Sequence, residues 1–160
     1  MIRARLATAL FAALLLHPGE APAQRAACGQ TPAAVSRDLA RQVNAQRAAQ
    51  GLSAVAASPR LDAVAKAHAC DMARRGRMGH DGTDGSNLGQ RLGRGGYRFG
   101  LAAENIAHGF DSVAAVTQSW MQSPGHRANI LRPAATDLGI GVAQPAGGRP
   151  YWVLLLAAPL

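Results

Sequence analysis

The chain has few aromatic residues and a single lysine, Lys66. Phenylalanine, tryptophan and tyrosine make up 4% of the 160 residues, and the formal charge of +8 at pH 7 comes mainly from scattered arginines. Because no aromatic platform accompanies the basic residues, the composition argues against nucleic acid as a partner. The charge indicates either attraction to an anionic surface, such as lipid headgroups or wall polymers, or an ordinary solvated basic surface.

Long hydrophobic runs are also missing. No stretch reaches the roughly 18 apolar residues that a membrane-spanning helix requires. The apolar run Leu6–Leu16 follows Arg3 and Arg5 and precedes Ala21-Pro22-Ala23, a small-residue cleavage site. This order is typical of a secretory signal peptide, which we place at residues 1–23.

Cleavage after Ala23 would leave residues 24–160, a length typical of one domain. The formal charge would fall only from +8 to +7, because the leader contains Arg3, Arg5 and Glu20. We therefore expect a single exported domain, either secreted or periplasmic, with no transmembrane segment in the mature chain.

Cysteine is limited to Cys28 and Cys70, and neither has a metal-like spacing to a second cysteine. An even count in an exported chain favours a disulfide, although two free thiols remain the alternative. The bridge would close a loop of 43 residues, a constraint worth ~4 kcal/mol on the chain-entropy model. On a helix Cys70 would face away from the apolar stripe, where an N-terminal tail could bring Cys28 to it.

Two amphipathic helices are predicted in the first half of the chain. Thr31-Pro32 provides a cap and a first-turn proline, and Gly51 ends the segment. Ser58-Pro59 opens the second helix in the same way. Its apolar stripe is Leu61, Val64, Ala65, His68, Ala69, Met72 and Ala73.

The second half mixes strands with a further helix. Residues 76–100 are rich in glycine and polar residues and predict a long loop with one helical turn near 88–92. Residues 103–107 predict a strand, and Asp111 or Ser112 caps a helix that contains Trp120.

A hairpin is predicted at the C-terminal end, with strands at 138–142 and 151–157. Leu154-Leu155-Leu156 breaks the alternation of a half-exposed strand, which indicates a central strand covered on both sides. Helices around a small sheet predict a layered α/β (α+β type) fold.

Two histidines and one carboxylate are candidates for a polar site. His80 and His126 lie outside any periodic apolar face, and Glu104 is the only glutamate outside the leader. Such side chains suit zinc or another divalent ion, and they could equally serve in acid–base chemistry. His68, on an apolar helix stripe, is interpreted as a core histidine. His108 would share a strand face with Glu104, which makes it a rival to either histidine.

A hydrolase would need a nucleophile, and none is convincing. Ser86 and Ser123 are candidates only by their proximity to the histidines, and no segment resembles a nucleophile elbow.

Several short motifs occur in an order that spans residues 44–152. They are Asn44-x-x-Arg47 with Gly51-Leu52, Leu61-x-x-x-Ala65-x-x-His68-Ala69-x-x-Met72, Gly79-His80, Ala103-Glu104-Asn105-Ile106, Trp120-x-x-Ser123-Pro124-Gly125-His126-Arg127-x-Asn129-Ile130, Gly139-Ile140-Gly141 and Tyr151-Trp152. Together they resemble the CAP superfamily of cysteine-rich secretory proteins, antigen 5 and plant pathogenesis-related proteins. The chain is similar to the short bacterial members.

The resemblance implies an α-β-α sandwich with a small central antiparallel sheet and a surface cleft. His80, Glu104 and His126 would lie in that cleft as ligands of zinc or another divalent cation. Met121-Gln122-Ser123 stands where fuller family patterns have a second acidic residue.

Four further polar residues of these motifs would have supporting roles. These are Asn105, Ser123, Arg127 and Asn129. In this interpretation Gly125 permits a bend, and Arg127 and Asn129 hydrogen-bond to neighbouring backbone and brace His126. The alternative is that the block only stabilises a corner of the fold.

Three classes of function follow from these observations. The resemblance favours a secreted module that binds a metal and a lipid, sterol or other envelope ligand. A metal-assisted hydrolase or protease and a purely structural interaction domain are the alternatives.

Overall fold

The computed structural model describes residues 31–160. The predicted signal peptide, its cleavage site and Cys28 lie outside these residues, so the Cys28–Cys70 bridge stays a prediction. Within the described part of the chain, no helix is both long enough and apolar enough to cross a bilayer.

A four-stranded sheet forms the centre, in the order β1-β3-β4-β2. Its strands are β1 (Ala56–Ala57), β2 (Phe99–His108), β3 (Asp137–Ala143) and β4 (Tyr151–Pro159). β4 pairs antiparallel with both β2 and β3, whereas the two-residue β1 pairs parallel with β3. The sheet is therefore mixed, and the expected antiparallel arrangement holds for the three longer strands.

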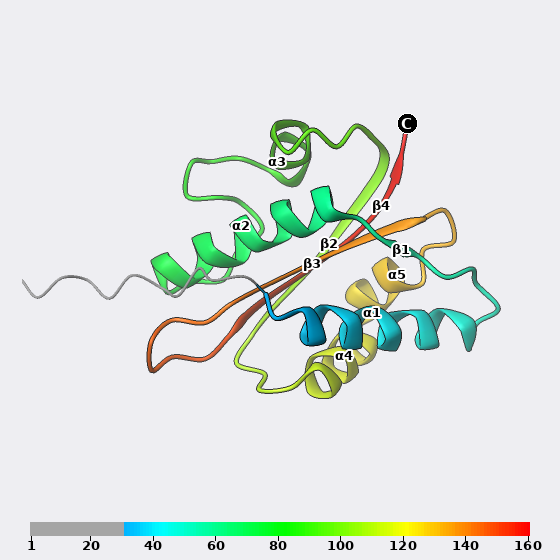
Figure 1. The fold of residues 1–160 in the computed structure, drawn as a ribbon, viewed down its shortest axis with the longest axis horizontal. Helices are drawn as coiled ribbons and strands as arrows, with labels where there is room; N and C mark the ends of the chain where they lie inside the picture. The colour runs from blue at the N-terminus through cyan, green and yellow to red at the C-terminus, as the bar shows by residue number, and fades with distance from the viewer. Residues whose placement is uncertain (1–30) are drawn as a thin grey trace, which may run out of the picture.

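Within residues 31–160, five helices cover the two faces of the sheet (Figure 1). α2 (Pro59–Arg75) and α3 (Leu88–Arg94) lie on one face. α1 (Ala33–Ala48), α4 (Val113–Gln122) and α5 (Pro124–Ile130) lie on the other. The α-β-α sandwich predicted from the sequence is confirmed.

β4 is covered on both sides, as the triple leucine predicts. Val153 and Leu155 join the cluster under α2 and α3, while Leu154 and Leu156 join the cluster under α1, α4 and α5. A strand that alternates between two apolar layers has no solvent-facing side, which explains the unbroken hydrophobic run.

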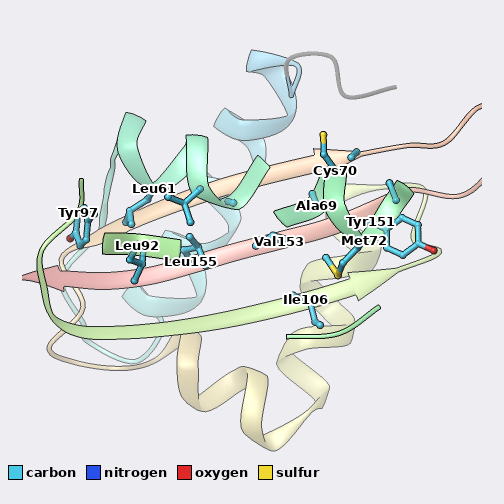
Figure 2. Packing of buried hydrophobic residues seen from close by; sticks show 14 of the residues in the cluster. Leu61, Ala69, Cys70, Met72, Leu92, Tyr97, Ile106, Tyr151, Val153 and Leu155 are labelled. Carbon is cyan, nitrogen blue, oxygen red and sulfur yellow. The ribbon is translucent and has the colours of Figure 1, made fainter. Parts of the chain in front are cut away.

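Figure 2 shows the cluster beneath α2, where Met72 points toward the sheet and the sulfur of Cys70 points away from it. The outward direction of Cys70 agrees with its position on the helix. The residue is nevertheless only 4% exposed. It lines a pocket that also borders Thr31, Ser36 and Lys66.

Helix caps follow the sequence at α2 and α4. The Ser58 hydroxyl accepts from the Leu61 N–H, and the Ser112 hydroxyl accepts from the Ala115 N–H. The predicted cap at Thr31 is wrong, because α1 begins without a side-chain cap. The Thr31 hydroxyl instead accepts a hydrogen bond from the Val142 N–H of β3.

Glycines in β3 set how closely α2 approaches the sheet. A Cβ atom at Gly139 would overlap the backbone and side chain of Leu61, and one at Gly141 would overlap the backbone of Ala65. Glycine in a strand often marks such a close approach. The helix that carries His68 is therefore seated directly on the β3 backbone.

Candidate functional site

Glu104 is the centre of a buried polar cluster on β2. Its side chain is 4% exposed. One carboxylate oxygen, Oε1, lies 2.9 Å from Nδ1 of His80, and the other, Oε2, accepts from Nη2 of Arg91 at 2.8 Å. A buried carboxylate is tolerated when charged donors surround it, and both oxygens here have a hydrogen-bond partner.

His80 follows the end of α2 and reaches Glu104 from the surface. Its side chain is 62% exposed. The segment that carries it is fixed by Arg91 of α3, whose Nη1 donates to the carbonyl oxygens of His80 and Ser86 at 2.8 and 2.9 Å. Arg91 thus binds the carboxylate and the backbone next to the imidazole with one guanidinium group.

His68 on α2 is buried at 1% exposure, which confirms the prediction of a core histidine. Its Nε2 lies 3.0 Å from the carbonyl oxygen of Gly79 and 3.8 Å from Oε1 of Glu104. Burial lowers the pKa of His68, and the nearby Glu104 carboxylate opposes this effect only in part. His68 is therefore neutral at neutral pH and borders the cluster.

His126 approaches from the opposite face of β2. Alternate residues of a strand face opposite sides, so Asn105 points to α5 where Glu104 points to α2 and α3. The Asn105 side-chain amide donates to the carbonyl oxygen of His126 at 3.0 Å. The Asn129 amide donates to Oδ1 of Asn105 at 2.9 Å and to the carbonyl oxygen of Glu104 at 3.4 Å.

The pKa of His126 is lowered from its ordinary value. Burial is the main cause that lowers the pKa of His126, and the charge of His80 lowers it further. β2 is an edge strand, so α5 and the His80 segment can approach around its open edge. Among residues 31–160, however, no group of three or more His, Cys, Asp or Glu side chains is gathered closely enough to hold a metal ion.

The Ser-Pro-Gly-His-Arg motif begins a separate short helix, α5. Ser123 is the boundary between α4 and α5, and Pro124 occupies the first turn of α5. Trp120 is 1% exposed and donates from Nε1 to the Ile106 carbonyl oxygen at 3.3 Å. The tryptophan therefore anchors α4 to β2 just before the turn that carries His126.

Asn129 makes hydrogen bonds next to His126, whereas the side chain of Arg127 points to solvent. The Arg127 side chain is exposed, and the described residues offer its guanidinium no hydrogen-bond acceptor. Its backbone N–H donates to the Ser123 carbonyl oxygen, which is an ordinary helical bond. The amide pair of Asn105 and Asn129 supplies the brace instead.

His108 is not part of the cluster. It shares the strand face of Glu104, but four residues of extended chain separate them by about 13 Å. Its ring packs on Tyr151 at a centroid distance of 4.2 Å. The structure thus favours His80 over His108 as the histidine next to the carboxylate.

Sequence reasoning missed Arg91 as a partner of Glu104. A buried arginine is rare and would indicate a functional or structural role, but burial cannot be read from the sequence. Arg91 also lies in a segment interpreted as mostly loop. Sequence reasoning also missed the role of Arg47, which is fully buried and donates to the carbonyl oxygens of Ile130 and Arg132 at 2.8 and 2.9 Å. These bonds fix the end of α5 against α1.

The cluster is suited to ligand binding more than to nucleophilic catalysis. His80 presents an exposed imidazole with one nitrogen held by a buried carboxylate, an arrangement that orients metal-binding histidines. No serine hydroxyl is hydrogen-bonded to a histidine in the part of the chain that the structure describes. A serine–histidine pair for acyl transfer is therefore not formed there.

The chain has a bacterial relative of greater length. It is 31% identical over 111 residues to the uncharacterized protein YkwD of Bacillus subtilis (strain 168), covering 69% of this chain and 43% of YkwD. It thus spans less than half the length of that relative.

Solved structures share the fold. An extracellular protein containing an SCP domain from Bacillus anthracis str. Ames superposes with a TM-score of 0.70 at 29% identity, over 81% of this chain and 44% of that one. An outer surface protein from Borrelia burgdorferi gives a TM-score of 0.76 at 19% identity, over 81% of this chain and 96% of that one.

A more distant structure, that of NaASP2 with Zn²⁺, gives a TM-score of 0.58 at 14% identity over 80% of this chain and 81% of that one. The family model for the cysteine-rich secretory protein family, CAP, matches residues 25–156. With this match over most of its length and the α-β-α sandwich around the Glu104 cluster, the chain belongs to the CAP family.

Proposed function

We propose that the protein is an exported, non-catalytic binding module whose His80 and His126 hold a divalent metal ion, with zinc the best chemical match. The observation that carries this proposal is the 2.9 Å contact between Nδ1 of His80 and Oε1 of Glu104. With Nδ1 donating to the carboxylate, Nε2 of His80 keeps its lone pair for a metal ion.

The protonation state of His126 also supports a metal site. Its pKa is lowered mainly by burial, so the imidazole is neutral and available as a ligand at neutral pH. Bound zinc would act as a Lewis acid toward a further ligand. Glu104 would serve by orienting His80 or by completing the ligand set with His80 and His126.

A two-histidine site with open positions would suit a ligand that completes the coordination of the metal. Met78, which precedes His80 by two residues, is an exposed large apolar side chain at 48% exposure. This supports a small lipid-like, sterol or other envelope ligand. The formal charge of the exported form, +7 after cleavage of the leader, supports contact with an anionic envelope surface.

Export is part of the proposal because of the N-terminal leader and because structural neighbours are extracellular or outer-surface proteins. The predicted disulfide between Cys28 and Cys70 would belong to the same exported form.

Zinc titration followed by thermal unfolding tests the metal site. We expect zinc to raise the melting temperature of the wild-type protein, because a ligand that binds only the folded state stabilises it. The double variant His80→Ala with His126→Ala should lose this shift. Glu104→Gln should weaken zinc binding by about 10- to 100-fold if the carboxylate acts through His80.

His108→Ala is the matched control, because His108 packs on Tyr151 away from the cluster. It should keep the full response to zinc. An equal zinc-induced shift in the wild type and in the double variant would contradict the proposal.

A further inference from the structure

A pocket of about 490 Å³ lies between α2 and residues 82–95. Its apolar wall includes Ala63, Val64, Ala67 and Gly95. Neither His80 nor Glu104 lines it. Its size and its mainly apolar wall with a few polar groups are typical of small-molecule sites.

His68 and Arg91 lie at the floor of this pocket and separate it from Glu104. Each has one buried polar atom without a hydrogen-bond partner among the described residues: Nδ1 of His68 and Nε of Arg91. The two residues are 1% and 8% exposed. The buried hydroxyl of Ser86, which also lines the pocket, has no partner among the described residues either. Buried polar atoms are normally satisfied, so three unsatisfied ones at one pocket point to a missing partner.

The other atoms of these side chains fix what each free atom can do. Nε2 of His68 faces the Gly79 carbonyl oxygen at 3.0 Å and therefore carries the proton, which leaves Nδ1 as an acceptor. The Nη1 and Nη2 groups of Arg91 are bound to backbone carbonyls and to Glu104. Nε–H of Arg91 is a donor that still needs an acceptor.

The charged side chains that line the pocket are paired with one another or with Glu104. Three arginines and two aspartates line the pocket, and the aspartates already have partners. Asp84 accepts from Arg94 at 2.7 Å, and Asp71 accepts from the Thr83 N–H at 3.0 Å. The three arginines are engaged as well, so the preference for an anion comes from the unpartnered Nε–H of Arg91. A guanidinium donor binds a carboxylate more strongly than it binds a neutral acceptor.

We propose that this pocket binds a small organic carboxylate with an O–H or N–H group next to the carboxylate, as in a 2-hydroxy acid or an N-acyl amino acid. The carboxylate accepts from Nε–H of Arg91, the adjacent donor binds Nδ1 of His68, and the apolar part packs on Ala63 and Ala67. The proposal does not depend on metal binding at His80 and His126.

Access to the two atoms requires a side-chain movement, because both are covered by their neighbours. Binding should therefore change the nuclear magnetic resonance signals of these two atoms. The ¹⁵N signals of Nδ1 in His68 and of Nε in Arg91 report directly on the hydrogen bonds that the ligand would make.

Four related compounds test the ligand chemistry with the full mature chain. N-acetylalanine and lactate each have a carboxylate and an adjacent donor, and they distinguish the amide source from the hydroxyl source. The methyl ester of N-acetylalanine lacks the charge, and propionate lacks the donor. We expect one or both of the first pair to bind in the millimolar range typical of so few atoms and to shift both ¹⁵N signals.

The methyl ester and propionate should bind at least about tenfold more weakly. Equal binding of all four compounds would overturn the assigned chemistry. Absence of binding by both N-acetylalanine and lactate would overturn the site.

Ala67→Leu and Ala63→Leu test the location. Both alanines are exposed on α2, so a larger side chain fills the pocket without entering the core. Each variant should weaken binding by at least about tenfold, whereas Ala114→Leu, at an exposed position of α4 on the other side of the sheet, should bind like the wild type. Unchanged binding in both pocket variants would place the ligand elsewhere and overturn the site. His80→Ala should leave binding intact, which separates this test from that of the metal site.

Discussion

The two faces of β2 differ in the chemistry that they present from neighbouring residues. Glu104 faces α2 and α3 and is held by Arg91 and His80, whose side chains can carry positive charge. Asn105 faces α5 and is held by neutral amide and carbonyl groups of Asn129 and His126. The Glu104 face gathers ionisable side chains, whereas the Asn105 face holds the backbone of α5 in place.

The difference indicates how the candidate site is divided. The charged face fixes the imidazole of His80 directly through its ring nitrogen. The amide face binds the backbone carbonyl of His126 and makes no hydrogen bond to its ring. The Glu104 face should therefore govern stability and electrostatics, and the Asn105 face should govern the placement of α5.

Removing the cation from the charged face should have the largest effect. Arg91→Met leaves the buried Glu104 carboxylate without its main partner, and we expect the free energy of unfolding to fall by about 3–5 kcal/mol. Urea unfolding measures this change. The exposed pair of Arg149 and Asp111 provides the control, because Arg149→Ala should change stability little. Equal effects of the two variants would contradict the importance of the buried pair.

Removing the amide on the other face should cost less. Asn105→Ala deletes a fully buried group that bonds to His126 and Asn129, and it leaves the carbonyl of His126 without that donor. We expect a loss of about 1–3 kcal/mol in urea unfolding. Gln144→Ala, which removes an exposed side-chain bond to Gly148, is the matched control and should be near neutral. A stability loss as large as that of Arg91→Met would erase the contrast between the faces.

His68 and His126 should contribute differently to the pH dependence of the free energy of unfolding. Both have a folded-state pKa below the ordinary value, so below about pH 6.5 the unfolded chain binds more protons than the folded one. Stability should fall as the pH is lowered from that point, and it should be fully present above it. Urea unfolding across this range should show a shallower pH slope in His68→Gln, with a smaller change in His126→Gln because His126 is only half-buried. Identical slopes in the wild type and both variants would contradict this assignment.

The smallest effect is expected at the end of β2. His108→Ala removes a ring contact with Tyr151 at an exposed position and should cost no more than about 1 kcal/mol. Its pH slope in urea unfolding should match that of the wild type. A marked change in the slope would mean that His108 contributes to the polar cluster.

Local signals in the sequence predicted much of the fold. Ser58-Pro59 and Ser112 mark helix starts that the structure confirms, and the triple leucine marks the doubly covered strand β4. The helical turn expected near 88–92 is α3, whose Asn87 and Gln90 form a capping box. Such signals act over a few residues, so sequence alone reveals them.

Contacts between distant segments were harder to predict. The pairing of Glu104 with His80 joins residues 24 apart. Residue type made them candidates for one site, and the resemblance to a family placed them in one cleft. Arg91 was missed because its role depends on burial, which follows from tertiary packing. β1 was missed because a two-residue strand has no periodicity to detect.

The two glycines of β3 determine the separation between α2 and the sheet. Because the missing side chains at Gly139 and Gly141 let α2 rest on bare strand backbone, any residue larger than glycine there would lift α2 outward. His68 would move with it, away from Glu104 on a different strand. Substitutions at these two positions would thus change the distance between His68 and Glu104, although neither glycine contacts these side chains. The geometry of the polar cluster could therefore evolve without a change in its functional groups.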